Sequence, residues 1–88
     1  MNGSRRAAIL LDQIDLGVSI ELISVDHNGS TTFSRRRPYR GIDQQFNVVK
    51  LENGPDEQKP QKPDWHPLDQ VITVYRGADD VWRLKVRV

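Results

Sequence analysis

The sequence predicts a mainly β protein in which one short N-terminal helix precedes five strands that curl into a small, strongly bent barrel. Apolar residues recur with a period of two over most of the chain, which is typical of strands. Turn-forming pairs such as Asn28-Gly29 separate these segments. The chain has only 88 residues, so its five strands must be short. Five short strands form a small, partly open barrel more readily than a two-sheet sandwich.

The composition indicates a single lean domain over residues 1–88. Hydrophobic residues make up 36% and charged residues 28%, and a chain this short buries about 60–65% of its unfolded surface. Thirteen basic and twelve acidic residues give a net charge of +1, and a charge this small does not by itself indicate a polyanionic partner. There are no cysteines, which excludes disulfides and thiolate metal sites. The longest apolar run covers residues 7–11, so we expect no membrane span, no signal peptide and a cytoplasmic location.

Residues 4–16 are predicted to form the helix. Ser4 can cap its N-terminus, and Gly17 can supply a left-handed C-cap. The apolar positions recur with helical spacing at Ala7, Leu10, Leu11 and Ile14. Acidic residues near the C-terminal end oppose the helix dipole, so the helix must be stabilised by docking.

Five strands are predicted after the helix, at residues 18–25, 30–36, 45–52, 70–76 and 81–88. Asn28-Gly29 joins the first two as a hairpin, and a tight turn at residues 77–80 joins the last two. Pro38 and Gly41 place a loop between the second and third strands. The expected order is a meander whose last strand is an exposed edge. Such an edge invites pairing with another copy, so we expect a homo-oligomer.

Residues 54–69 are predicted to be a flexible, proline-rich loop. They contain four of the five prolines and mostly polar side chains. This composition cannot bury enough apolar surface to offset the entropy of ordering. Trp65 is the one large aromatic side chain of this segment and could pack against another surface.

No arrangement of residues typical of catalysis is visible. His27 lies in the predicted hairpin turn, and His66 lies in the predicted loop beside Trp65. Asp79 and Asp80 are adjacent turn formers. General acid–base chemistry needs titratable groups that converge in a pocket. We therefore expect a non-enzymatic binding module with no cofactor and no metal.

A cluster of arginines is the clearest candidate binding feature. Arg35, Arg36, Arg37 and Arg40 fall within six residues, with Tyr39 between them. Guanidinium groups interleaved with an aromatic ring can follow the phosphates of a single strand and stack on its bases. The alternative interpretation is a solvated strand end without a partner.

Two short motifs add to this cluster. Asp43, Phe46 and Asn47 stand at the start of the third predicted strand, and Arg76-Gly77 precedes the last strand. Taken alone, the first motif is a strand start whose Asp and Asn bond the local backbone. With the order of elements, both motifs resemble the Sm-like family, which includes the bacterial Hfq proteins, over residues 4–88. The resemblance implies an SH3-like/Sm-like barrel and a ring that binds single-stranded RNA. In that ring Asn47 would contact a base edge, Arg76 would approach phosphate or base, and Phe46 would lie in the core.

Two hypotheses about function follow. The leading one is a non-enzymatic nucleic-acid-binding module, with single-stranded RNA favoured. Its candidate residues are Arg35, Arg36, Arg37, Tyr39, Arg40, Asn47 and Arg76. The alternative is a protein-interaction or assembly module, for example a phage or plasmid accessory protein, which binds a protein partner through an edge strand and the Trp65 loop. The near-neutral charge favours the alternative, whereas the arginine cluster and the motifs favour nucleic acid.

Overall fold

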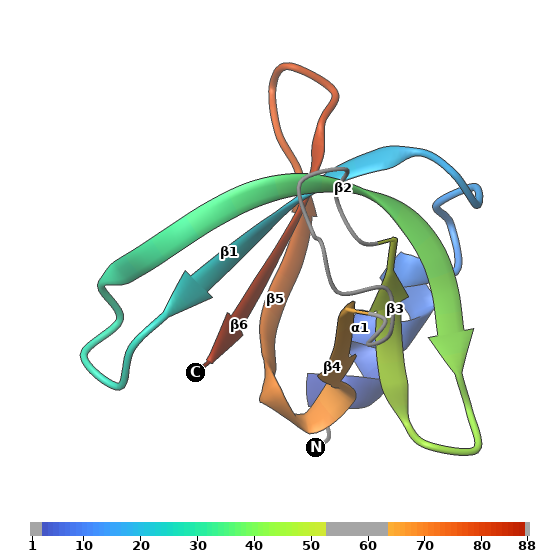
Figure 1. Cartoon of the computed structure of the whole chain (residues 1–88), viewed down its shortest axis with the longest axis horizontal. Helices are drawn as coiled ribbons and strands as arrows, with labels where there is room; N and C mark the ends of the chain where they lie inside the picture. The colour runs from blue at the N-terminus through green and yellow to red at the C-terminus, as the bar shows by residue number, and fades with distance from the viewer. Residues whose placement is uncertain (1–2, 53–63, 88) are drawn as a thin grey trace, which may run out of the picture.

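The computed structural model describes residues 3–52 and 64–87. Its elements are helix α1 (Gly3–Leu11), strands β1 (Ser19–Val25), β2 (Thr31–Asp43), β3 (Val48–Leu51) and β4 (Asp64–Pro67), the short 3-10 helix η1 (Leu68–Gln70), and strands β5 (Val71–Arg76) and β6 (Trp82–Arg87) (Figure 1). The six strands form one sheet in the order β4-β3-β2-β1-β6-β5. The predicted mainly β class with one short helix is confirmed. The predicted five-stranded meander is wrong, because the sheet has six strands and is not closed into a barrel.

Strand β2 joins the two halves of the sheet. Its first part pairs with β1, from Val25↔Thr31 to Ser19↔Pro38, and its last part pairs with β3. The register runs from Tyr39↔Leu51 to Ile42↔Val49, so two residues of β2 oppose the single residue Lys50 in a bulge. Such a bulge bends a strand, and β2 arches over the molecule in Figure 1. The predicted loop at Pro38 and Gly41 is therefore wrong, since both residues lie within β2.

Gly41 is the position where this bend depends on glycine. Its φ is +98°, and a Cβ added there would lie 3.2 Å from Leu16 Cδ2. We expect Gly41→Ala to lower the free energy of unfolding by about 1–2 kcal/mol, because the backbone conformation is strained for a residue with a side chain. Urea denaturation measures the change. Gly17→Ala, at a similar φ of +92° with open space around it, should lose stability through backbone strain alone, so any larger loss at Gly41 measures the contact with Leu16. An unchanged stability for Gly41→Ala would contradict the requirement for glycine at the bulge.

The last strand, β6, lies inside the sheet. It pairs in parallel with β1, from Glu21↔Arg83 to Val25↔Arg87, and antiparallel with β5. The β5–β6 hairpin forms as predicted, with Gly77 N–H donating to Val81 O at 2.9 Å across its turn. The sheet edges are therefore β4 and β5. The prediction of an exposed edge at the last strand is wrong.

Part of the predicted flexible loop is a strand. β4 pairs antiparallel with β3 through Val49↔His66 and Leu51↔Asp64, and η1 follows it. Pro67 is tolerated because β4 is an edge strand that needs hydrogen bonds on one side only. The predicted loop over residues 54–69 is thus wrong for residues 64–69, and its residues 54–63 lie outside the described residues.

Helix α1 is shorter than predicted and ends at Leu11. The next residues form turns with hydrogen bonds between residues three apart. Gln13 N–H donates to Leu10 O at 3.1 Å, and Ile14 N–H donates to Leu11 O at 3.0 Å. Gly17 therefore does not cap the helix. The predicted apolar face is nevertheless used, because Ala7, Leu11 and Ile14 are buried. They pack in one core with buried residues of the sheet and of η1: Ile20, Leu22, Tyr39, Val49, Leu51, Leu68, Val74, Leu84 and Val86.

Candidate nucleic-acid interface

The side of the sheet opposite the core carries a set of basic residues. Side chains alternate between the two faces of a strand, so residues directly opposite one another share a face. One row across four strands is Arg36, Glu21, Arg83 and Tyr75. The next rows add Lys85 and Arg87 from β6. We call Arg36, Arg83, Lys85, Arg87 and Tyr75 the outer basic face.

Arg83 is fixed at the centre of this face by two acidic side chains. Its Nε donates to Glu21 Oε1 at 2.9 Å, and its Nη1 and Nη2 donate to the two oxygens of Asp79, each at 2.9 Å. The hydrogen bonds from Arg83 and then from the Val81 N–H lower the pKa of Asp79 to about 2. Two carboxylates therefore share the single positive charge of Arg83, which leaves this group with a net charge of −1, and Arg83 ties β6 to β1.

The other three cations of the outer basic face are available to a ligand. Among the described residues, Arg36, Lys85 and Arg87 form no salt bridge. Lys85 Nζ lies 6.0 Å from the centre of the Tyr75 ring, and this ring is 38% exposed. A face with three cations and one exposed aromatic ring can bind a chain that carries both phosphates and flat bases.

The structure divides the arginine cluster between the two faces of β2. Arg36 lies on the outer basic face. Arg35 and Arg37 lie opposite Leu22 and Ile20 of β1, on the face that carries the core. The cluster therefore does not form one continuous patch, and only Arg36 joins the cations of β6.

Arg35 is part of a clamp between β2 and β4. Its guanidinium donates to Asp64 Oδ2 and lies 5.3 Å from the centre of the Phe33 ring. His66 Nε2 lies 2.8 Å from the other Asp64 oxygen. Burial alone would raise the pKa of Asp64, but the hydrogen bonds and charges of His66 and Arg35 outweigh it and hold the pKa below 3.8. Because its charge is engaged by Asp64, Arg35 does not fit the predicted phosphate contact.

Tyr39 is a core residue. Its side chain packs among the buried residues of the sheet and is 2% exposed. Burial, and secondly the charge of Asp12, raise the pKa of Tyr39 to about 12. A ring so placed cannot stack on a ligand, so the prediction that Tyr39 binds nucleic acid is wrong.

The two motif residues Asn47 and Arg76 do not meet within the chain. Asn47 is exposed in the turn before β3 with a φ of +56°, and its carbonyl accepts the Leu68 N–H at 2.9 Å. Leu68 precedes β5, whereas Arg76 ends it, with its Nε 3.4 Å from Asp80 Oδ1. The length of β5, at about 3.3 Å per residue, separates them by roughly 16 Å or more. A single nucleotide therefore cannot contact both residues of one chain.

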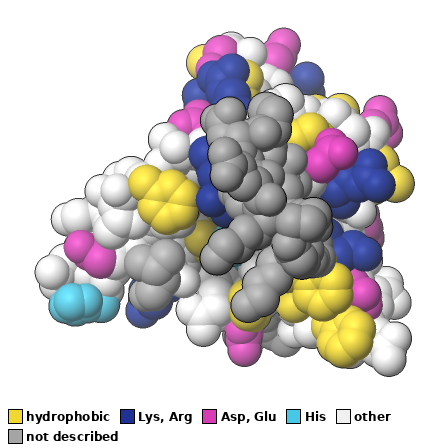
Figure 2. All heavy atoms as spheres, viewed as in Figure 1, with side chains coloured by type: hydrophobic (Ala, Val, Ile, Leu, Met, Phe, Trp, Pro, Cys, Tyr) yellow, Lys and Arg dark blue, Asp and Glu magenta, His cyan; other side chains and the backbone are white. Residues whose placement is uncertain are grey.

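An exposed aromatic pair lies at the other end of the sheet. Phe46 and Trp65 are 56% and 40% exposed, and their ring centres lie 5.6 Å apart at an angle of 36°. The prediction that Phe46 lies in the core is wrong. Figure 2 shows hydrophobic side chains reaching the surface in separate groups, with basic side chains elsewhere on the same view. The sequence separates the two rings by nineteen positions, and only the β3–β4 pairing brings them together.

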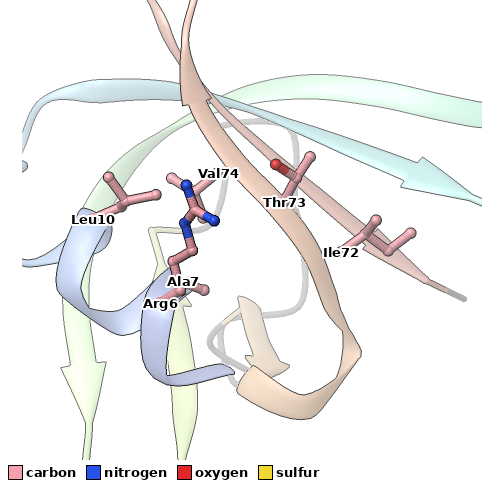
Figure 3. A pocket seen from close by; sticks show the side chains of 6 residues that line it. All are labelled: Arg6, Ala7, Leu10, Ile72, Thr73 and Val74. Carbon is pink, nitrogen blue, oxygen red and sulfur yellow. The ribbon is translucent and has the colours of Figure 1, made fainter. Parts of the chain in front are cut away.

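A groove of about 310 Å³ runs between α1 and β5 (Figure 3). It is lined by Arg6, Ala7, Leu10, Ile72, Thr73 and Val74. Among the described residues that line the groove, Arg6 is the one ionisable side chain.

Comparison with protein-family models, with curated proteins and with solved structures found no match. Across residues 3–52 and 64–87, no helix has the length and apolar character needed to cross a bilayer. The fold and its surfaces define a small mainly β domain with a basic sheet face. The function is inferred from these surfaces.

Proposed function

We propose that this protein is a non-enzymatic, cytoplasmic module that binds single-stranded nucleic acid through its outer basic face. The observation that carries the proposal is that Arg36 of β2, Lys85 and Arg87 of β6 and Tyr75 of β5 share one face of the sheet, with Lys85 beside the Tyr75 ring. RNA is favoured over DNA by the resemblance of the Asp43 and Arg76 motifs to the Sm-like family. A ring-shaped homo-oligomer is the assembly that this resemblance implies, with β4 and β5 as the edges available for pairing.

Local charge on the outer basic face, rather than the total charge of the protein, favours binding to a polyanion. The net charge is only +1, but Asp64 and Asp79 are held by Arg35 and Arg83. Arg36, Lys85 and Arg87 outweigh the excess carboxylate of the Glu21–Arg83–Asp79 group, so the outer basic face keeps a local positive potential. An unpaired strand presents a phosphate at each nucleotide and a flat base that can stack on Tyr75. Such binding depends on the backbone and tolerates different sequences.

We expect the triple variant Arg36→Gln, Lys85→Gln, Arg87→Gln to lose most of its affinity for single strands. Each phosphate contact on a single strand contributes about −0.7 to the slope of log K against log salt, so three contacts give a slope near −2. Wild-type affinity should thus fall roughly twentyfold between about 50 and 200 mM salt. The variant should be weak at both salt concentrations, with a much shallower slope. Fluorescence anisotropy of a labelled oligouridine measures both quantities.

The control is the double variant Arg6→Gln, Arg37→Gln, which removes positive charge from outside the outer basic face. It should keep the wild-type slope. Equal losses in both variants would show that total charge, not this face, drives binding. A wild-type protein that binds no oligonucleotide at either salt concentration would contradict the proposal. That result would favour the alternative, a protein-interaction module that uses the aromatic pair and the β4 edge.

A further inference from the structure

The aromatic pair of Phe46 and Trp65 is not explained by the packing of the core. Phe46 lies in the turn before β3, and Trp65 lies on the edge strand β4. Each ring exposes a large part of its surface to water, although each also packs against the other. Adjacent exposed apolar side chains of this size commonly mark a binding site.

One cation lies beside the aromatic pair, and a second lies on the next strand. Lys50 lies directly opposite Trp65 in the β3–β4 register, and its Nζ is 5.8 Å from the centre of the Trp65 ring. The bulge in β2 sets Arg40, which is exposed, opposite Lys50. The nearby carboxylate of Asp43 accepts hydrogen bonds from the backbone N–H groups of Gln45 and Phe46, at 2.9 and 3.2 Å. It is therefore committed to the turn that presents the Phe46 ring.

We propose that this cluster is a stacking site for one unpaired nucleotide. The base stacks on the Phe46 ring, which is the more exposed of the two, while Trp65 supports that ring from the side. Lys50 and Arg40 hold the phosphate. The choice of ligand rests on the proposed function, but the site is distinct from the outer basic face.

The chemistry of the cluster selects a nucleotide among ligands that bind aromatic rings. A nucleotide combines a flat π surface with a negative charge, and the cluster combines two rings with two cations. A proline-rich peptide would use the rings and leave the cations without a partner. A neutral sugar would do the same.

We expect Phe46→Ala to weaken binding of an oligouridine by about 5- to 100-fold, the usual effect of losing one stacked base. The slope of affinity against salt should not change, because stacking releases no counterions. Phe46→Tyr should restore most of the affinity. Phe33→Ala is the matched control, since Phe33 is 45% exposed on β2 and lies outside the cluster. Equal losses for Phe33→Ala and Phe46→Ala would overturn the proposal.

A second measurement separates this proposal from the proposed function. Adenosine monophosphate, titrated into the wild-type protein to tens of millimolar, should shift the indole N–H resonance of Trp65 and leave that of Trp82 unchanged. A shift at Trp65 supports the stacking site even if oligonucleotide binding proves independent of the outer basic face. No shift at Trp65, or equal affinity for an oligouridine and an abasic strand of the same length, would overturn the stacking site. The outer basic face would remain supported by its own salt dependence.

Discussion

Replacing Tyr39 with alanine is expected to lower the free energy of unfolding by about 3–5 kcal/mol, the usual cost of removing a buried aromatic ring. The total free energy of unfolding of a native domain is about 5–15 kcal/mol, so this loss is a large share of the stability. Tyr39 stands where β2 passes from β1 to β3, and its ring fills the core beneath that point. Its N–H donates to Val18 O and its carbonyl accepts from Gly17 N–H, both at 2.8 Å. Urea denaturation followed by circular dichroism measures the loss.

Tyr39→Phe is the control for this prediction. It keeps the ring and should retain most of the stability and the full affinity for single strands. A Tyr39→Ala variant that keeps its stability but no longer binds single strands would contradict the core position of Tyr39. It would indicate that Tyr39 contacts the ligand. A Tyr39 phenol that ionises at its ordinary pKa of 10.0 would also contradict the core position, since burial raises that pKa to about 12. A Tyr75→Phe background isolates the titration of Tyr39.

The second large effect is expected at the clamp between β2 and β4. Asp64→Asn removes the charge that pairs with Arg35 and His66, and we expect it to cost about 1–3 kcal/mol near neutral pH. The Asp64 side chain is only 13% exposed, so water cannot readily replace it. Asp69→Asn, at an exposed position of η1, is the control and should change stability little.

The pH dependence of this effect has a definite sign. Burial acts to raise the pKa of Asp64, but the hydrogen bonds and charges of His66 and Arg35 outweigh burial and lower the folded-state pKa below 3.8. Its contribution to stability is therefore fully present above the unfolded pKa and is lost as pH falls through the folded pKa. The difference between wild type and Asp64→Asn should shrink from about pH 6 to about pH 3. A difference of equal size at both pH values would show that the carboxylate charge does not stabilise the clamp.

Local sequence signals predicted the hairpins well. Asp26 carries much of the first turn, because its Oδ1 accepts the N–H groups of Asn28 and Ser30 at 2.9 and 3.0 Å. These contacts span four residues or fewer, so the residues of the turn alone specify it. The alternation of β6 was equally readable, with Leu84 and Val86 in the core.

Interactions between distant segments explain what the sequence did not predict. Pro38 and Gly41 are typical of loops, but here they lie where β2 changes its pairing partner and bends. Residues 64–67 lack the pattern of a strand, and their pairing with β3 makes them one. The parallel pairing of β6 with β1 has no local signal at all.

The candidate site was only partly predictable for the same reason. The period of two, extended through residue 37, would have separated Arg35 and Arg37 from Arg36. No spacing in the sequence, however, brings Arg36 beside Lys85, or Phe46 beside Trp65. Those neighbours depend on which strands pair.

The parallel pairing of β1 with β6 also affects the order of folding. The hydrogen bond between Glu21 and Arg83 joins residues 62 positions apart, whereas the β1–β2 hairpin closes a loop of a few residues. Closing a long loop costs more chain entropy and is slower than closing a short one. The hairpin that carries Arg36 can therefore form early, while Lys85 and Arg87 join it only when β6 docks. Most of the positive charge of the outer basic face is assembled in the last steps of folding, so a nascent chain that still lacks β6 does not yet carry the proposed site.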